Sequence, residues 1–409
     1  MNRQFTLRCL TAMLAAVGCI SAAAAEDKPV KAAPEAIKQL IDELGADEFS
    51  TRESATEQLV RVGLPAYKAV EEAMQHSDRE VRYRAERVLG RIRQSDLQRR
   101  LDAFLAGKEA TDDYQLPGWT RFKQAFGDDR TSRSMFVDLT KTDAELLQAL
   151  ENNPRAAGEA FSNRLTQYKQ LAQFGGNAGL HLSFGQIAAL VFVAGEKDIT
   201  LNQTDSSLIF SYCSQQAFSE GFANAKNGEI PRKMLSRIIL RSEDWAAYSA
   251  MSLARRYNMK EGLVAAEKIL KGNRQPHMAS MALSTIASMG NESHLPLVEK
   301  LLTDTALVTQ MQEKDKVLRK LEVRDAALAT AIFLSKQDLK DYYDVPAGQN
   351  ISEPQFIMTN PRVIGHTDEA KRTEVFKKWA DYRAKNPLPA AAEKKTDEPA
   401  KEPAPEEKK

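Results

Sequence analysis

Residues 47–93 are DEFSTRESATEQLVRVGLPAYKAVEEAMQHSDREVRYRAERVLGRIR, a stretch in which one pattern occurs twice. An arginine, an alanine and a leucine of the first copy return 30 positions later, as Arg52 and Arg82, Ala55 and Ala85, and Leu59 and Leu89. A second amphipathic segment, Pro65 to Met74, lies between the copies. Periods of roughly 20–50 residues are typical of stacked repeats that bury their apolar faces against neighbours. The stretch predicts helix, turn, helix, turn and then the first helix again.

A similar pattern returns in the second half of the chain, with a step of 32 residues. It relates Leu263, Glu267 and Leu270 to Leu295, Glu299 and Leu302, and Ala250 to Ala282. A further first helix is expected over Val323 to Leu334. Residues 120–240 do not keep the period. They are either repeats that have lost the pattern or an inserted helical domain.

At these copies the chain resembles the HEAT-repeat family, whose units are antiparallel helix pairs stacked into a curved solenoid. It is also similar to exported bacterial proteins with HEAT-like repeats, on the strength of Leu116-Pro117-Gly118-Trp119-x-x-Phe122, the run Val323 to Ala329, and Lys377-Lys378-Trp379. The resemblance implies an all-α fold, an α-solenoid of stacked helix pairs. It implies binding and scaffolding, and it brings no catalytic residues.

Composition fits a helical globular chain without a dominant charge. The 409 residues are 43% hydrophobic and 28% charged, with a formal net charge of +1. A leader containing Arg3 and Arg8 but no acidic residue is expected to be removed, which leaves 55 basic against 56 acidic residues. A nearly neutral chain has no overall attraction to nucleic acid, so no nucleic-acid partner is expected.

The first 25 residues are typical of a secretory signal. Arg3 and Arg8 precede an apolar run from Cys9 to Ile20, and Ala23-x-Ala25 fits the cleavage pattern. We expect cleavage before Glu26, export to the periplasm or cell envelope, and no transmembrane span in the mature chain. Lipoprotein processing at Cys19 and an uncut N-terminal anchor are the alternatives, and the apolar run is short for a membrane span.

Five segments follow from these features. They are a signal peptide (1–25), N-terminal HEAT-like repeats (26–115), an irregular helical region (116–241), C-terminal HEAT-like repeats with a connector and a final helix (242–384), and a disordered tail (385–409). The tail is predicted from its Ala, Pro, Lys and Glu composition, which cannot bury enough apolar area to order the chain.

Several local elements can be predicted in detail. A helix should begin at Pro34, and Phe184 to Ala194 should form a buried central helix. Ser50-x-x-Glu53 and Ser77-x-x-Glu80 have the form of capping boxes. We also expect helices at Arg130–Thr140 and Asp143–Glu151, caps at Thr142, at Thr204 or Asp205, and at Thr367, and a connector from Tyr342 to Gly365 that is either a binding loop or a strap.

No motif for catalysis, cofactor binding or metal binding is present, so no residue is predicted for these roles. None of the five histidines lies three or four positions from another, although His277 and His294 could meet across one repeat. Cys213, the only cysteine beyond the leader, lacks the surroundings that activate a nucleophile and is expected in a helix core. The loop Gly175–Gly179 lacks the Lys-Ser/Thr ending of a phosphate-binding loop.

The strongest candidate for binding is a basic helix. Its proposed partner-binding residues are Arg82, Arg84, Arg87 and Arg91. Guanidinium groups on one helix face can grip carboxylates or phosphates through bidentate hydrogen bonds. The alternative is that acidic neighbours, Glu80, Glu86, Asp96 and Asp102, pair with these arginines and leave an ordinary solvated face.

Two functions from different classes remain at this stage. The repeats, the leader and the missing catalytic motifs favour an exported, non-enzymatic helical-repeat scaffold that binds a protein partner. The alternative is a helical hydrolase of envelope polymers, whose active site would bring two carboxylates from distant helices to face each other across a cleft.

Overall fold

A computed structural model describes residues 33–107, 114–174, 182–272, 275–313 and 316–388. These residues form helices and a single two-stranded sheet, so the predicted all-α class is confirmed. The expected signal peptide, the Gly175–Gly179 loop and residues 389–409 of the expected tail lie outside the described residues. The chain divides into two compact units, 1–114 and 115–409. Residues 116–241 and 242–384, which the sequence separates, belong to the same unit.

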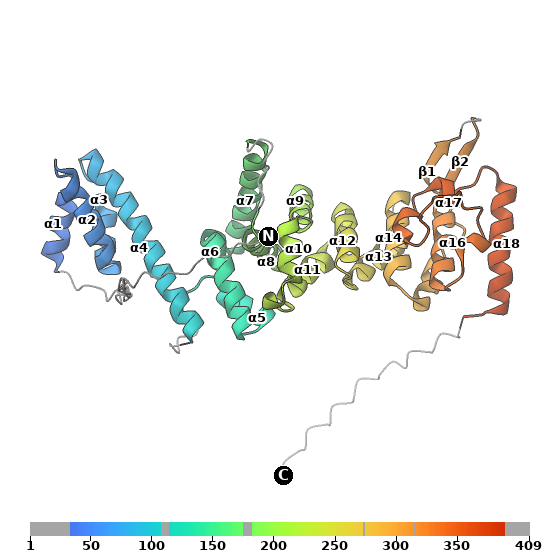
Figure 1. The fold of residues 1–409 in the computed structure, drawn as a ribbon, viewed down its shortest axis with the longest axis horizontal. Helices are drawn as coiled ribbons and strands as arrows, with labels where there is room; N and C mark the ends of the chain where they lie inside the picture. The colour runs from blue at the N-terminus through green and yellow to red at the C-terminus, as the bar shows by residue number, and fades with distance from the viewer. Residues whose placement is uncertain (1–32, 108–113, 175–181, 273–274, 314–315, 389–409) are drawn as a thin grey trace, which may run out of the picture. The chain divides into compact units, whose positions relative to one another are not determined.

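The first unit contains the two copies of the sequence repeat (Figure 1). Its elements are α1 (Pro34–Glu43), α2 (Phe49–Val62), a 3-10 turn η1 (Leu64–Ala66), α3 (Tyr67–Ala73) and α4 (Arg79–Ala106). Helix α4 packs against both α2 and α3. The repeated alanines and leucines, Ala55, Ala85, Leu59 and Leu89, are buried in one core. The first helix of each copy therefore contacts the first helix of the other through the positions that recur.

The recurring arginine has a structural role in both copies. Arg52 donates from Nη1 to the carbonyl oxygens of the residues six and five positions before it, at 2.7 and 2.8 Å. Arg82 makes the same two bonds, at 2.6 and 2.8 Å. These carbonyls belong to the turn before each helix, where intrahelical donors are lacking. We call this arrangement the arginine clasp; it fastens each turn to the helix that follows.

The predicted serine and threonine caps are wrong. Asp78, not Ser77, caps α4, where its carboxylate accepts from the Glu80 amide at 2.7 Å. Ser50 lies inside α2. The caps predicted at Thr142 and Thr367 are instead formed by the next residue in each case. Asp143 accepts a hydrogen bond from the Leu146 amide, and Asp368 accepts one from the Lys371 amide. An aspartate cap adds a negative charge at the positive end of the helix, which a hydroxyl cannot.

The first half of the second unit is built around a buried helix. Its elements are α5 (Trp119–Phe126), α6 (Arg130–Asn152), α7 (Pro154–Phe174), α8 (Phe184–Ala194), α9 (Gln203–Cys213), α10 (Gln216–Ala223), η3 (Ala225–Asn227) and α11 (Ile230–Arg241). Residues 187–194 of α8 are all buried, and this helix contacts α6, α7, α9, α10 and α11, as its apolar sequence predicts. The two helices expected over 130–151 are confirmed as two helical stretches of α6, which meet at Asp143, where the backbone is not helical. The N-cap of α9 is Asn202, rather than Thr204 or Asp205.

The second half continues with helices that pack on their neighbours in sequence. They are α12 (Asp244–Arg256), α13 (Glu261–Lys271), α14 (Pro276–Met289), η4 (Glu292–His294), α15 (Leu295–Glu299), α16 (Val323–Leu334), η5 (Leu339–Asp341), η6 (Pro354–Phe356), α17 (Pro361–Ile364) and α18 (Glu369–Lys385). Helix α14 contacts α12, α13 and α16. At the α12–α13 contact, a Cβ on Gly262 would lie 2.4 Å from the Ala254 Cβ, so only glycine permits this approach.

A β-hairpin between α15 and α16 was not predicted. Strand β1 (Leu307–Gln312) pairs antiparallel with β2 (Leu318–Glu322). The repeat pattern assigns no element to this segment, although β-branched residues at Val308 and Thr309 favour a strand. The predicted connector 342–365 packs over the helices, with Ile357 and Met358 fully buried and η6 against α14. It is thus a strap rather than an open loop.

Candidate functional site

Two of the four candidate arginines on α4 are occupied by structural contacts. The guanidinium of Arg84 is buried and donates to Glu80 Oε1 and to Glu53 Oε1, both at 2.7 Å. Arg82 forms the second arginine clasp. The expectation that acidic neighbours pair with the arginines of this helix is thus met for Glu80, and also for Asp96, which pairs with Arg99 and Arg100 at 2.8 and 2.9 Å. Arg84 uses Nε and Nη1 in these bonds and is buried, so it is not available to a partner, whereas Arg82 uses only Nη1 in its clasp.

The other two, Arg87 and Arg91, are exposed. Neither forms an ion pair within the described part of the chain. The Arg87 guanidinium carbon lies 5.7 Å from the centre of the Tyr83 ring, at cation–π distance. A hydrogen bond from Arg84 lowers the pKa of Glu53, and the charges of Arg87 and Arg91 lower it further. These side chains therefore share one electrostatic environment on the surface of α2 and α4.

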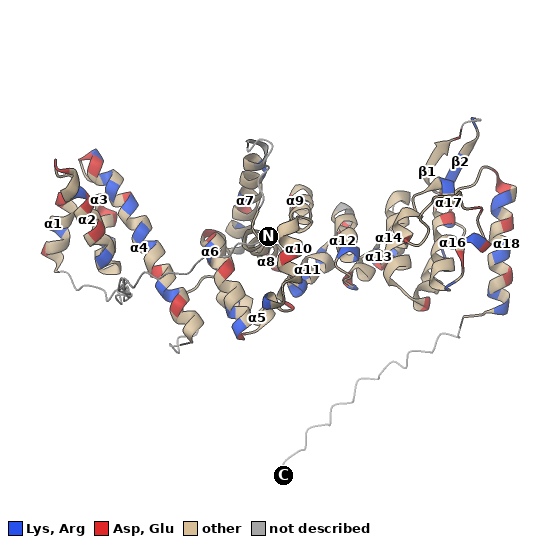
Figure 2. Cartoon of the chain, viewed as in Figure 1, with Lys and Arg blue, Asp and Glu red and all other residues tan. Residues whose placement is uncertain are grey.

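Exposed aromatic side chains complete this surface. Phe49 is 62% exposed and Tyr83 is 56% exposed. The guanidinium carbon of Arg84 lies 5.8 Å from the centre of the Phe49 ring. We define the arginine–aromatic face as Phe49, Glu53, Tyr83, Arg87 and Arg91. Figure 2 shows mainly basic residues along α4 with fewer acidic residues among them, so the helix is not a purely positive stripe.

The aromatic members of this face were missed, although the repeat contains a signal for them. Phe49 occupies the position of Arg79 in the second copy, and Tyr83 that of Glu53 in the first. A position that is charged in one copy of a repeat is a surface position in both. An aromatic residue at such a position is therefore expected to be exposed, and exposed aromatic residues are enriched in binding surfaces.

A groove adjoins the face at Arg91. It has a volume of about 810 Å³ and lies between the end of α2, the turn η1 and α4. Apolar side chains line it, namely Val60, Val62, Leu64, Pro65 and Ile92, and charged groups form its rim, namely Arg61, Arg91, Asp96, Arg99 and Asp102. Leu64 is 53% exposed. The groove thus offers apolar area beside the exposed arginines.

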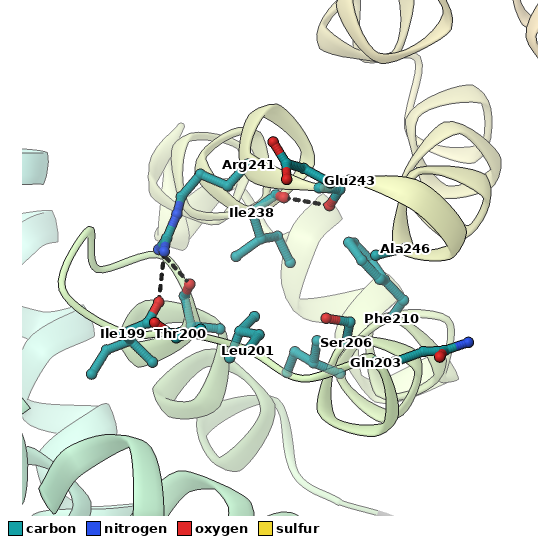
Figure 3. A pocket seen from close by; sticks show the side chains of 13 residues that line it. Ile199, Thr200, Leu201, Gln203, Ser206, Phe210, Ile238, Arg241, Glu243 and Ala246 are labelled. Atoms are coloured by element: carbon teal, nitrogen blue, oxygen red, sulfur yellow. Dashed lines mark hydrogen bonds between the residues drawn. The ribbon is translucent and has the colours of Figure 1, made fainter. Parts of the chain in front are cut away.

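The second unit has a cavity of about 420 Å³ at the ends of α8, α9, α11 and α12 (Figure 3). Arg241 donates to the carbonyl oxygens of Ala194, at 3.0 Å, and Ile199, at 2.6 Å, and so holds the wall in place. Glu243 is the only carboxylate among the described lining residues, and its hydrogen bond from Lys268 lowers its pKa. A general acid needs a raised pKa, so this cavity does not supply the carboxylate pair of a hydrolase.

A buried polar cluster joins α16, α18 and the strap. Arg372 donates to both carboxylate oxygens of Asp325, at 2.9 and 3.2 Å. His366 Nε2 lies 3.7 Å from Asp325 Oδ1, and neither that nitrogen nor the Tyr343 hydroxyl has a hydrogen-bond partner among the described residues. Burial raises the pKa of Asp325 to about 6, against the effect of Arg372. Burial, with the charges of Arg372 and Arg319, lowers the pKa of His366 to about 4.

The remaining sequence candidates have packing roles. Cys213 is fully buried, and burial raises the pKa of its thiol, as expected for a core cysteine. The His277 ring stacks on Tyr248, and His294 Nε2 lies 3.6 Å from Glu267. In the described ranges no cluster of three or more His, Cys, Asp or Glu side chains is placed to hold a metal ion. None of the helices described there is both long and apolar enough to cross a membrane.

No protein-family model matches the chain, and no curated protein matches it with significant similarity.

Proposed function

We propose that this chain is an exported, non-enzymatic protein of the HEAT-repeat type that binds a protein partner through its N-terminal unit. The stacked helix pairs would form a solenoid, of which α2, α3 and α4 are one part. The leader supports delivery to the periplasm or cell envelope. The observation that carries the proposal is the arginine–aromatic face, where Phe49 and Tyr83 are exposed at surface positions of the repeat.

The geometry of this face suits recognition. A side chain that is already positioned loses less conformational entropy when it binds, and Arg87 is held against Tyr83 before any partner arrives. Aromatic and arginine side chains contribute most of the energy in many interfaces. The groove beside Arg91 adds apolar area for a partner helix or loop. A partner segment that carries carboxylates next to apolar side chains would fit both.

The test is a binding comparison between matched variants. The mature chain is immobilised and exposed to envelope extract, and retained proteins are compared with those retained by Tyr83→Ala/Arg87→Glu/Arg91→Glu. We expect the partner to be lost in that variant, because the charge reversal repels an acidic segment and the truncation removes an aromatic contact.

The control is Arg362→Glu, a charge reversal on α17 in the second unit, which should retain the partner. Far-ultraviolet circular dichroism establishes that all three proteins are folded. Equal recovery by the triple variant and the unmodified chain would place binding elsewhere. Catalytic turnover of an envelope polymer by the mature chain, with no protein retained, would contradict the proposal.

A further inference from the structure

The cavity at the ends of α8, α9, α11 and α12 has the size and lining of a small-molecule site. Its volume of about 420 Å³ lies within the range of roughly 300–1,000 Å³ that is usual for ligand pockets. Its inner wall is apolar and no more than 4% exposed, and it consists of Ala194, Ile199, Ile209, Phe210 and Ile238. An apolar group that enters this space is removed from water, which favours its binding.

One hydroxyl in this lining has no hydrogen-bond partner. Ser206 lines the cavity from the first turn of α9 and is 7% exposed. Its hydroxyl forms no hydrogen bond within the described part of the chain, whereas those of Ser207 and Ser242 donate to carbonyl oxygens four positions earlier. Figure 3 shows Ser206, Leu201 and Ile238 around a common space. Leaving a buried hydroxyl unpaired costs free energy, so a ligand that supplies a partner for Ser206 relieves that cost.

The charged groups of the lining are already bonded within the chain. Arg241 donates from both Nη atoms to main-chain carbonyl oxygens, which are those of Ala194, Glu196, Lys197 and Ile199. Glu243 forms an ion pair with Lys268, at 2.6 Å. Arg241 and Glu243 are the only charged residues in the described lining, and their charges are opposite. An ionised ligand would lose hydration in the cavity without gaining an unpaired counter-ion, so the lining favours an uncharged one.

We propose that the cavity binds an uncharged small molecule that combines an apolar body with one hydroxyl or amide group. The apolar body packs against the inner wall, and the polar group exchanges a hydrogen bond with Ser206. A hydroxyl both donates and accepts, so an alcohol and a primary amide can each pair with it. A wholly apolar ligand would leave Ser206 unpaired, and an ionised ligand would be desolvated without a counter-ion.

The first experiment compares the binding of five probes that share one benzene ring to the full mature chain. Benzyl alcohol and benzamide are uncharged and polar, toluene is apolar, benzoate is an anion and benzylamine is a cation at neutral pH. Dissociation constants come from titrations followed by nuclear magnetic resonance at constant ionic strength. We expect benzyl alcohol and benzamide to bind at least about tenfold more tightly than the other three. No preference for the two polar uncharged probes, or no binding by any probe, overturns the proposal.

The second experiment tests the contact with Ser206. Ser206→Ala removes the hydroxyl and should weaken the binding of benzyl alcohol and benzamide about tenfold, with toluene bound as well as before or better. Ser207→Ala, at an exposed position of α9 outside the described lining, is the matched control and should change none of the dissociation constants. Alanine is a good helix former, so both variants should fold, which circular dichroism checks. Undiminished binding of benzyl alcohol by Ser206→Ala overturns the proposed contact.

A third measurement locates the probes. Ala246→Leu places a larger side chain in the cavity and should weaken every probe that binds there, the polar and the apolar alike. Ala370→Leu, the same change at an exposed position of α18, is its control and should leave binding unchanged. Probes that bind Ala246→Leu as tightly as the unmodified chain occupy another site, which overturns the assignment of this cavity. The cavity belongs to the second unit and shares no residue with the arginine–aromatic face, so either proposal can fail without the other.

Discussion

The N-terminal unit and the C-terminal end of the second unit use arginine in different ways. In the N-terminal unit, Arg52 and Arg82 bind carbonyl oxygens five and six residues away. At the C-terminal end, buried Arg372 binds Asp325, 47 residues away in sequence. The clasps fix local turns and recur with the repeat, whereas the Arg372–Asp325 pair holds α18 against α16. Hydrogen bonds between residues close in sequence recur with the sequence repeat and can be recognised from it. A hydrogen bond between residues far apart in sequence has no such pattern.

The largest difference between the two regions is expected in the free energy of unfolding when a single arginine is replaced. Arg372→Met leaves the carboxylate of Asp325, which is 0% exposed, without its partner. An unpaired buried charge costs about 3–5 kcal/mol. We expect that loss in the free energy of unfolding of the second unit, measured by urea titration. Asp325→Asn/Arg372→Met should recover part of it, since no charge is then stranded. If Arg372→Met lowered the free energy of unfolding no more than replacement of an exposed arginine does, the buried Arg372–Asp325 pair would not stabilise the second unit as described.

The buried cluster also predicts an unusual pH dependence. Because the pKa of Asp325 is raised from 3.8 to about 6, the folded state holds a proton that the unfolded chain releases, and stability from this group falls as pH rises through that window. Because the pKa of His366 is lowered from 6.5 to about 4, the unfolded chain binds a proton that the folded state excludes, and stability from this group rises between those pH values. From pH 4 to 6 the two effects oppose each other.

Replacing one residue should expose the effect of the other. In His366→Gln the Asp325 contribution remains, so the free energy of unfolding should fall by about 2 kcal/mol between pH 4 and pH 6, because the slope reaches at most 1.36 kcal/mol per pH unit between the two pKa values. Asp325→Asn should show the opposite slope. The measurement is urea unfolding at a series of pH values. Identical slopes in the two variants would mean that the cluster does not control this dependence. No buried Asp or His is found among residues 33–107 and 114 of the N-terminal unit.

Much of the helical framework could be predicted from the sequence, because its determinants are local. The spacing of Ala55, Leu59 and their counterparts gave the helices of the first unit, and the apolar run of α8 gave a buried centre. The caps were misplaced by one residue at Asp78, since serine and aspartate are both good caps and pattern alone does not rank neighbours. The hairpin was missed because Val308 and Thr309 are only a weak local signal for a strand, and strand propensity depends strongly on context, here packing against α14, α16 and α17.

The candidate site was predicted only in part, for the same physical reason. Helical spacing placed Arg84, Arg87 and Arg91 on one face, but spacing within one helix does not show which residues a neighbouring helix buries. Contact with Glu53 of α2 removes Arg84 from the surface, and Phe49 of α2 adds an aromatic ring there. The cluster of Asp325, His366 and Arg372 has no local pattern, because three separate segments contribute to it.

The clasps themselves provide a smaller and stricter test. Hydrogen bonds from charged donors contribute about 1.5–3 kcal/mol net, and partial exposure reduces this. We expect Arg52→Met and Arg82→Met each to lower the free energy of unfolding of the first unit by about 1–2 kcal/mol, with Arg52→Met nearer the upper value because Arg52 Nε also lies 3.4 Å from Glu80 Oε1. Arg79→Met, an exposed residue with no ion pair in the described chain, is the control and should be nearly neutral. If the two substitutions lowered the free energy of unfolding by very different amounts, the repeated sequence would not provide the same stabilisation in both copies.

The smallest change in the free energy of unfolding is expected for an arginine hydrogen bond that is exposed to solvent. Arg93 Nε donates to the Tyr67 hydroxyl at 2.9 Å, with its guanidinium carbon 5.3 Å from the ring centre. Tyr67→Phe removes the acceptor and keeps the ring, and water can replace the lost bond on an exposed surface. The change in the free energy of unfolding should stay within about 0.5 kcal/mol, as for most surface substitutions. Thermal unfolding of the variant beside Arg82→Met measures both on one scale. If Tyr67→Phe lowered the free energy of unfolding as much as Arg82→Met, solvent exposure would not distinguish the Arg93–Tyr67 hydrogen bond from the clasp bonds to the turn carbonyls.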